Sequence, residues 1–502
     1  MFIDKGPPTR ADAAGPEVAT DKGIVRGMWE NGLAVFRGIP YAKAPVGALR
    51  FAAPVQRDPW SGVRETTEFG PPPPQPMRIT SSDEWLTVNV WTPDLRTSTL
   101  PVMVWIYGGA FTIGSSDQPE FDGAGLAAQG IVVVSLNYRV GVEGFMQIEG
   151  APSNRGLLDQ IAALQWVSNN IPGFGGDPDN VTVFGQSAGA ASIGMLLVAP
   201  GAAGLFHRGI AESVPASLFG RDLAADIATV IAGELGCRPT VAELTATSPA
   251  ALVTASADVA KAVTQYQGRW GYDVVVRGSV FGPVIDGAVL PDSPWRALAG
   301  GMGRDVALLI GHNSAEYNLA IALAGGPGQV TVAEANRALR LLPPVADGAQ
   351  AYRAAYPQAG HAELYGLVCS DFVYRMPSLH LAQSHAGGGG TTHLYEFRFD
   401  ASPMGAAHTT EIPLVFGTLT SPVGAQFYGS PPSLAAVGVS AEITSAWGSF
   451  ATNGDPGWPA YDPVNQLARV FDTQSTVARY PEQASQEIWA RCPFDPFPLQ
   501  HR

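Results

Sequence analysis

One stretch of the 502-residue chain, residues 181–197, constrains its fold more than any other. It begins with Val181-Thr182-Val183-Phe184, an apolar, β-branched run typical of a buried strand. Gly185-Gln186-Ser187-Ala188-Gly189 follows at once, and small helix-forming residues come next. A strand joined to a helix by so short a turn is typical of α/β folds. The two glycines fit such a turn because a side chain at either position would collide with the strand or the helix.

In this context, Gly-x-Ser-x-Gly indicates a nucleophilic serine, Ser187, on a strained turn. The alternative for the pentapeptide alone is a Gly/Ser-rich turn without chemistry. Because a serine hydroxyl is a weak nucleophile, it needs a base, an acid that orients the base, and donors for the developing oxyanion. In this kind of fold the acid and then the base follow the serine along the chain, each in a loop at the carboxyl end of a strand.

Candidate oxyanion donors lie in a loop before the serine. Gly108-Gly109-Ala110 follows residues 100–107, a nearly continuous apolar run that predicts a strand covered on both faces. Small residues there would let backbone N–H groups approach a substrate closely. We therefore predict donors at Gly109, at Ala110 and at Ala188, directly after the serine, with a simple Gly-Gly turn as the alternative.

The candidate base is His408, which lies in a loop just past the predicted strand 392–399. The other histidines are His207, His312, His361, His380, His385, His393 and His501, and none combines such a position with the required chain order. For the acid, Glu316 follows the predicted strand 306–310 and lies between Ser187 and His408 in the chain. Asp286 is the rival that the residues alone leave open.

The predicted elements describe an α/β fold with a large, mainly parallel sheet covered by helices on both faces. Further strands are expected at residues 86–91 and 131–136, and a helix at residues 156–167. Residues 23–36 indicate a small N-terminal antiparallel meander with an Asn-Gly turn. Helical insertions are expected at residues 221–264 and 331–385. No repeat or long polar linker is found, so we expect a single domain over residues 1–502, with a disordered tail at about residues 1–15.

Composition excludes several classes of function. The net charge is −14, from 30 basic and 44 acidic residues, without a dense Lys/Arg run, so nucleic acid is not expected as a partner. No apolar run is long enough to span a membrane, and the N-terminus does not resemble a secretory signal. Three scattered cysteines argue against a disulfide framework and a zinc site. These features predict a cytoplasmic protein and leave its oligomeric state open.

With these motifs in place, the chain resembles the type-B carboxylesterase family of the α/β-hydrolase superfamily over residues 23–461. The matching segments are residues 36–42, 105–111, 137–139, 174–189, 405–411 and 447–451. The resemblance implies that Ser187 is the nucleophile, Glu316 the acid and His408 the base. It favours Glu316 over Asp286.

Three residues depart from the family pattern. Trp85 replaces a cysteine, so the N-terminal disulfide of secreted members cannot form. Ala110 stands where some members have a third glycine but keeps its N–H. Glu143 stands where members usually have an apolar residue, and the sequence offers no reason for it. Because cholinesterases shape their choline site near the position of Trp85, choline specificity is not expected here.

The expected function is hydrolysis of small to medium carboxylic esters through a Ser-His-Glu triad and a covalent acyl-enzyme, without metal or organic cofactor. An amide, carbamate or lactone hydrolase with the same triad is the alternative. A non-catalytic esterase-like binding protein is a more distant one, since such proteins typically lose the serine. Candidate pocket residues, equally compatible with the core, are Phe111, Val214, Leu218, Phe372 and Phe416.

Overall fold

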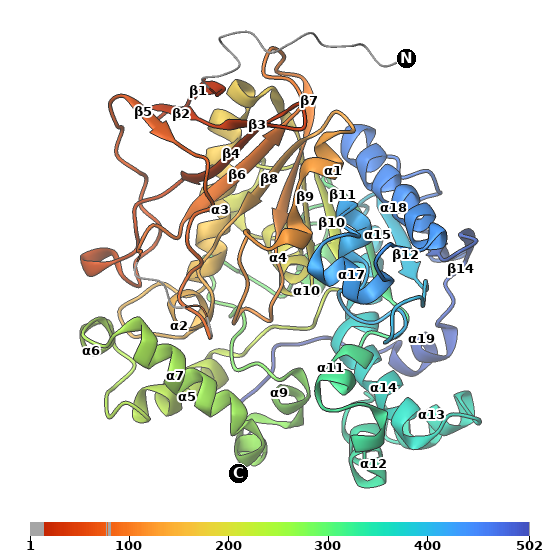
Figure 1. Cartoon of the computed structure of the whole chain (residues 1–502). Helices are drawn as coiled ribbons and strands as arrows, with labels where there is room; N and C mark the ends of the chain where they lie inside the picture. The colour runs from red at the N-terminus through yellow and green to blue at the C-terminus, as the bar shows by residue number, and fades with distance from the viewer. Residues whose placement is uncertain (1–14, 77, 79–81, 501–502) are drawn as a thin grey trace.

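The computed structural model describes residues 15–76, 78 and 82–500, and an 11-stranded sheet forms its centre (Figure 1). In spatial order the strands are β14 (Thr476–Arg479), β13 (Leu467–Phe471), β12 (Thr392–Phe397), β11 (Ala307–Asn313), β10 (Arg208–Glu212), β9 (Gly176–Gln186), β7 (Leu100–Ile106), β8 (Val132–Leu136), β6 (Thr87–Thr92), β4 (Leu33–Pro40) and β3 (Met28–Glu30). The tail expected at residues 1–15 lies outside the described residues, apart from Gly15.

The middle of this sheet is parallel and its edges are antiparallel. Neighbouring strands from β8 through β13 run parallel, whereas β14, β6, β4 and β3 pair antiparallel with their neighbours. The carboxyl ends of β9, β11 and β12 therefore meet at one edge, which is where open α/β sheets bind their ligands. The expected mainly parallel sheet is confirmed.

The N-terminal segment is divided between two sheets. An Asn31-Gly32 turn, with both residues at positive φ, joins β3 to β4 as the sequence predicted, and this hairpin extends the large sheet. A separate sheet contains β1 (Glu17–Ala19), β2 (Ile24–Arg26) and β5 (Val63–Glu65). In it β1 and β2 are antiparallel but β2 and β5 are parallel, so the meander expected as one unit is split.

Helices cover the sheet and extend it at one end. Those packed on the strands include α3 (Arg155–Asn170), α4 (Ala188–Leu196), α15 (Met376–Gly387) and α18 (Leu434–Asn453). The inserted helices gather at the lower end of the molecule in Figure 1. They include α5 (Arg221–Gly233), α6 (Val241–Thr245), α7 (Pro249–Lys261), α12 (Val332–Leu341), α13 (Gly348–Ala355) and α14 (His361–Ser370). Both expected helical insertions are present.

A buried ion pair explains Glu143, the residue for which the sequence offered no reason. Glu143 lies on α2 (Gly141–Phe145), and its Oε1 accepts hydrogen bonds from Arg50 Nε and Nη2 at 3.0 and 2.7 Å. Both side chains are buried, at 3% and 7% exposure. Arg50 Nη1 also donates to the carbonyl of Thr247, so the pair ties the N-terminal region to the helical insertion. A charge at position 143 is tolerated because it has this partner.

Candidate active site

The turn after β9 has the strained geometry that the motif predicts. Ser187 has φ 57° and ψ −121°, an uncommon conformation for a residue with a side chain. A Cβ on Gly185 would lie 2.5 Å from the carbonyl oxygen of Ile106, and one on Gly189 would lie 1.9 Å from it. Only glycine fits at these two positions, because the neighbouring strand β7 passes so close. Ser187 N donates to Glu212 O at 2.8 Å, which fixes the turn to the end of β10.

The loop after β7 lies beside the serine. A Cβ on Gly108 would be 3.0 Å from Ser187 Cβ. Gly109 and Ala110 have φ of 114° and 53°. Among the described residues, neither backbone N–H donates a hydrogen bond to the protein. Ala188 is the first residue of α4, so its N–H precedes the first helical turn. The predicted donors thus lie in the loop beside Ser187 and directly after it in the chain, and their role stays a prediction.

His408 and Glu316 meet at the same edge of the sheet. His408 Nδ1 lies 2.6 Å from Glu316 Oε2, and His408 N donates to Glu316 O at 3.1 Å. Glu316 Oε1 accepts from Asn313 N at 2.8 Å, and the carboxylate is fully buried. Asp286 instead accepts hydrogen bonds from Ala288 N and Leu290 N in its own loop, at 2.9 Å each. The structure thus brings Glu316, and not Asp286, to the imidazole.

Two further residues contact the imidazole, and the sequence analysis missed both. The Tyr374 ring stacks on it, with centroids 4.0 Å apart and planes at 27°. Gln186 Nε2 lies 3.3 Å from His408 Nδ1 and 3.2 Å from Nε2. Among the described residues, no hydrogen bond of 3.5 Å or less joins the Ser187 hydroxyl to His408. Catalytic hydrogen bonds are often long or poorly aligned before substrate binds.

A cluster of buried carboxyl groups surrounds the pair. Asn313 Nδ2 donates to Glu411 Oε2 on one side, and Trp447 Nε1 donates to Glu212 Oε1 at 2.8 Å on the other. Burial, together with the Glu316 carboxylate, raises the pKa of Glu411 to about 7. Burial raises the pKa of Glu212 well above its usual value, and Glu411 adds to this. Burial therefore favours the neutral forms of Glu212 and Glu411 over their charged forms.

We expect Glu411→Gln to stabilise the protein above neutral pH and to leave it unchanged in weak acid. The folded pKa of about 7 exceeds the usual value of 4.5, so the ionised carboxylate opposes folding. This cost is absent below pH 4.5, grows between pH 4.5 and 7, and levels off above pH 7 at about 3 kcal/mol. Urea unfolding at pH 5 and pH 8 measures it. An equal difference between variant and wild type at both pH values would contradict the prediction.

A cavity of about 540 Å³ opens beside the loop that contains Gly108 and Gly109. Its lining is mostly apolar and includes Phe121, Leu319, Ile412, Val423 and Phe427, together with Gly109 and Gln186. The pocket residues suggested from the sequence are not among the lining residues. Phe111, Val214, Leu218, Phe372 and Phe416 are instead buried in the core. Those suggestions were wrong, because apolar side chains near the motifs pack against the sheet, while residues distant in sequence form the cavity wall.

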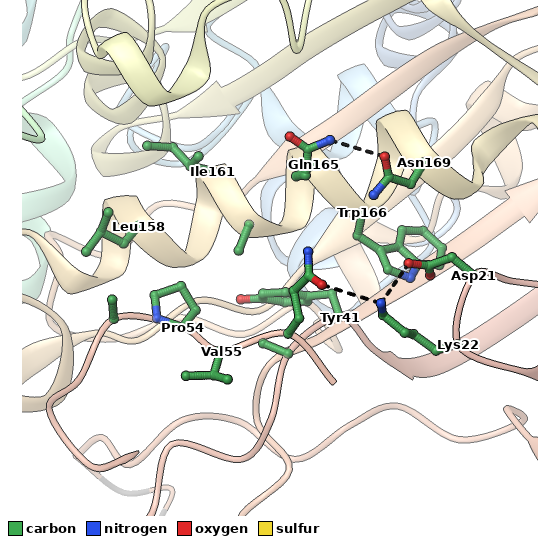
Figure 2. Close-up of a pocket in the computed structure, with 14 residues that line it drawn as sticks. Asp21, Lys22, Tyr41, Pro54, Val55, Leu158, Ile161, Gln165, Trp166 and Asn169 are labelled. Atoms are coloured by element: carbon green, nitrogen blue, oxygen red, sulfur yellow. Dashed lines mark hydrogen bonds and ion pairs between the residues drawn. The ribbon is translucent and has the colours of Figure 1, made fainter. Parts of the chain in front are cut away.

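A second cavity, of about 300 Å³, lies between α3 and the N-terminal segment (Figure 2). Leu158, Ile161 and Trp166 line it from α3, and Lys22 contacts Asp21 and Gln56 at its edge. No serine, cysteine or histidine is among the residues that line it in the described chain. It therefore lacks the serine and histidine predicted for the reaction, whereas the first cavity is lined by Gln186 and Thr409, the chain neighbours of Ser187 and His408.

The sheet, the serine turn and the acid–base pair define an α/β hydrolase. The sequence profile of the carboxylesterase family matches residues 14–489, so the chain belongs to the carboxylesterase family and is an enzyme of carboxylic ester hydrolysis. The chain is 35% identical to para-nitrobenzyl esterase of Bacillus subtilis, over 94% of this chain and 97% of that protein. It is 32% identical to fumonisin B1 esterase of Sphingopyxis macrogoltabida, over 92% and 87%. A crystal structure of a Geobacillus stearothermophilus carboxylesterase at pH 6.2 superposes with a TM-score of 0.84 at 35% identity, covering 94% and 99% of the two chains.

In the described part of the chain, no helix is both long enough and apolar enough to cross a membrane. Cys237, Cys369 and Cys492 are all free thiols. Trp85, in place of the family's cysteine, is 3% exposed and donates from Nε1 to Ser82 O at 2.7 Å.

Proposed function

We propose that the protein hydrolyses small to medium carboxylic esters by two-step acyl transfer through Ser187, His408 and Glu316. The single observation that supports this most is the 2.6 Å contact between His408 Nδ1 and Glu316 Oε2 beside a serine on a strained turn. With Nδ1 directed to the carboxylate, Nε2 is left as the proton acceptor. The family relationship supports the reaction class.

In the first step, His408 Nε2 takes the Ser187 proton as the serine oxygen attacks the ester carbonyl. The N–H groups of Gly109, Ala110 and Ala188 stabilise the oxyanion, and one such donor typically contributes about 3 kcal/mol. His408 then protonates the departing alcohol, and Glu316 stabilises the imidazolium while it exists. Water repeats the sequence on the acyl-enzyme and releases the acid. The reaction requires no metal or organic cofactor.

We expect a serine-reactive phosphonate to block hydrolysis of p-nitrophenyl esters with a stoichiometry of about one label per chain. Peptide mapping should locate the label on Ser187. Ser213, also buried and at positive φ one strand away, is the internal control and should stay unlabelled. Full inactivation with the label on another residue would refute the assignment of the nucleophile.

The apolar cavity supports an ester substrate with a hydrophobic group of modest size. A chain-length series of p-nitrophenyl esters would locate the preference. The names of two relatives supply further probes, a p-nitrobenzyl ester and a fumonisin-type ester. Matched amide, carbamate and lactone substrates test the alternative reaction, because the triad does not determine the leaving group. Faster turnover of an amide than of its matched ester would overturn the preference for esters.

We further propose that the whole chain acts as one domain in the cytoplasm. A continuous cluster of buried apolar residues, from Val18 to Phe497, supports the first statement. The free thiols and the loss of the family's cysteine at Trp85 support the second.

A further inference from the structure

The residue of interest is Tyr374, which lies in a single π-helical turn, Asp371–Arg375, between α14 and α15. Such turns insert one extra residue and are frequent at functional sites. Two buried contacts fix this one. Arg375 Nε lies 2.9 Å from Asp371 Oδ1, and Arg375 Nη1 donates to Ser314 O at 3.0 Å. These contacts hold the backbone on either side of Tyr374.

The contact between Tyr374 and His408 is a stack of two rings, at 4.0 Å and 27°. Gln186 Nε2 is almost equally distant from the two ring nitrogens, at 3.3 and 3.2 Å. An atom that lay in the plane of the imidazole at those two distances would overlap Cε1 of the ring. The Gln186 amide nitrogen therefore lies above or below the ring plane. The imidazole is therefore bound at Nδ1 by Glu316 and packed by the Tyr374 ring and the Gln186 amide, which restricts both tilt and rotation.

The phenol of Tyr374 lies near enough to Ser187 for the two hydroxyl groups to influence each other. Burial raises the pKa of Tyr374 well above its usual value and the Glu316 carboxylate adds to this, while the positive charge of Arg277 and a hydrogen bond with Ser187 oppose the shift. The phenol is accordingly neutral at working pH and keeps a proton to donate. Tyr374 therefore stacks on His408 and also neighbours Ser187, so one side chain lies next to both residues.

We propose that Tyr374 is a positioning residue of the active site: its ring holds the His408 imidazole and its phenol orients the Ser187 hydroxyl. The inference rests on the proposed function. Contact between the two hydroxyl groups restricts rotation of the Ser187 side chain. The charged or titratable groups around this arrangement are Glu316, Glu411 and Glu212 near the imidazole, and Arg277, at the end of α9 (Tyr272–Arg277), near the phenol.

Two substitutions separate the ring from the phenol. Tyr374→Phe keeps the stack and removes the hydroxyl, and we expect kcat to fall about 3- to 10-fold with KM unchanged. Tyr374→Leu removes the stack as well, and we expect kcat to fall about 100-fold. Water would then reach the imidazole and favour its charged form, so the acid limb of the kcat/KM profile should move to higher pH by about half a unit.

The matched control is Tyr266→Phe, because Tyr266 is also a stacked tyrosine, 4.2 Å from Trp270 and at 16°, and its ring contact does not involve Ser187, Glu316 or His408. It should keep the wild-type kcat and pH profile. The rate of phosphonate labelling should fall in parallel with kcat in both Tyr374 variants, because it reports the reactivity of Ser187 alone.

Wild-type kcat and an unshifted pH profile in both Tyr374 variants would overturn the inference, even if their Tm were lowered. Should Tyr374→Leu fail to fold, Tyr374→Phe decides, because it changes only one atom. Failure of the proposed function is a separate result: the wild-type protein would then neither hydrolyse the esters nor react with the phosphonate.

Discussion

Ser187→Ala is expected to lower kcat/KM for p-nitrophenyl butyrate by about 10⁴-fold or more while leaving the fold intact. The substitution removes the only group that can form the acyl-enzyme in the proposed mechanism. It does not disturb the turn, because the turn is held by the Ser187 N to Glu212 O bond and by the glycines on each side. Alanine also tolerates the backbone conformation about as well as serine does. Circular dichroism and Tm should match the wild type within a few degrees.

Two comparisons sharpen this result. Ser449→Ala removes a hydroxyl on α18 that donates to Asp455 O in an exposed position, and it should leave activity unchanged. Adding His408→Ala to Ser187→Ala should cost almost nothing further, because the residues of a triad act as a unit. Retention of more than a few per cent of activity in Ser187→Ala would refute the proposed mechanism.

The serine turn could be predicted because its information is local. The strand, the two glycines and the helix are contiguous in the chain. Glycine is required because a side chain at either position would collide with the neighbouring strand β7. The parallel sheet could be predicted for a similar reason, since continuous apolar runs alternate with helical segments along the chain. The strands expected at residues 86–91, 100–107 and 392–399 correspond to β6, β7 and β12.

The surroundings of the imidazole could be predicted only in part. Glu316 and Asp286 both follow apolar segments in the correct order, so the residues alone left the acid open. The family resemblance favoured Glu316, and the structure places that carboxylate against His408. Tyr374 is 34 residues before His408 in the chain, in a helical region without any motif. The orientation of the Tyr374 side chain depends on the extra residue of the π-helical turn and on the buried Asp371–Arg375 pair. Glu411 belonged to a matched segment, but its pKa depends on burial that a sequence does not reveal.

The prediction of the residues that line the cavity was wrong for a related reason. Aromatic and aliphatic residues close to the motifs were suggested as its lining, yet the strands beside those motifs need the same side chains to fill the core. Phe416, for example, packs edge-on against Trp105 at 4.9 Å beneath the active site. The wall is built from segments far apart in sequence, such as Leu319 after β11 and Phe427 on α17 (Pro422–Tyr428).

The second large effect is expected for Glu316→Gln, which should lower kcat by about 10³- to 10⁴-fold with little change in KM. Both carboxylate oxygens accept hydrogen bonds, Oε1 from Asn313 N and Oε2 from His408 Nδ1. Glutamine has one oxygen and one NH₂ group, so it can satisfy only one of these donors. If the oxygen stays with Asn313, the NH₂ group faces Nδ1 and favours the tautomer whose Nε2 carries the proton and cannot act as a base. If the oxygen turns to His408, the buried NH₂ group opposes the Asn313 N–H.

Asp286→Asn is the matched control, because it makes the same chemical change in the rival carboxylate. Asparagine keeps an oxygen for the Ala288 and Leu290 N–H groups and loses only the bond that Oδ2 accepts from Asn154 Nδ2 at 3.1 Å. This bond involves no triad residue, so activity should stay within about 2- to 3-fold of wild type. Steady-state kinetics of the two variants, with unfolding curves to show that each is folded, complete the test. If Asp286→Asn lost activity and Glu316→Gln kept it, the acid of the triad would be Asp286, and the contact between Glu316 and His408 would be structural alone.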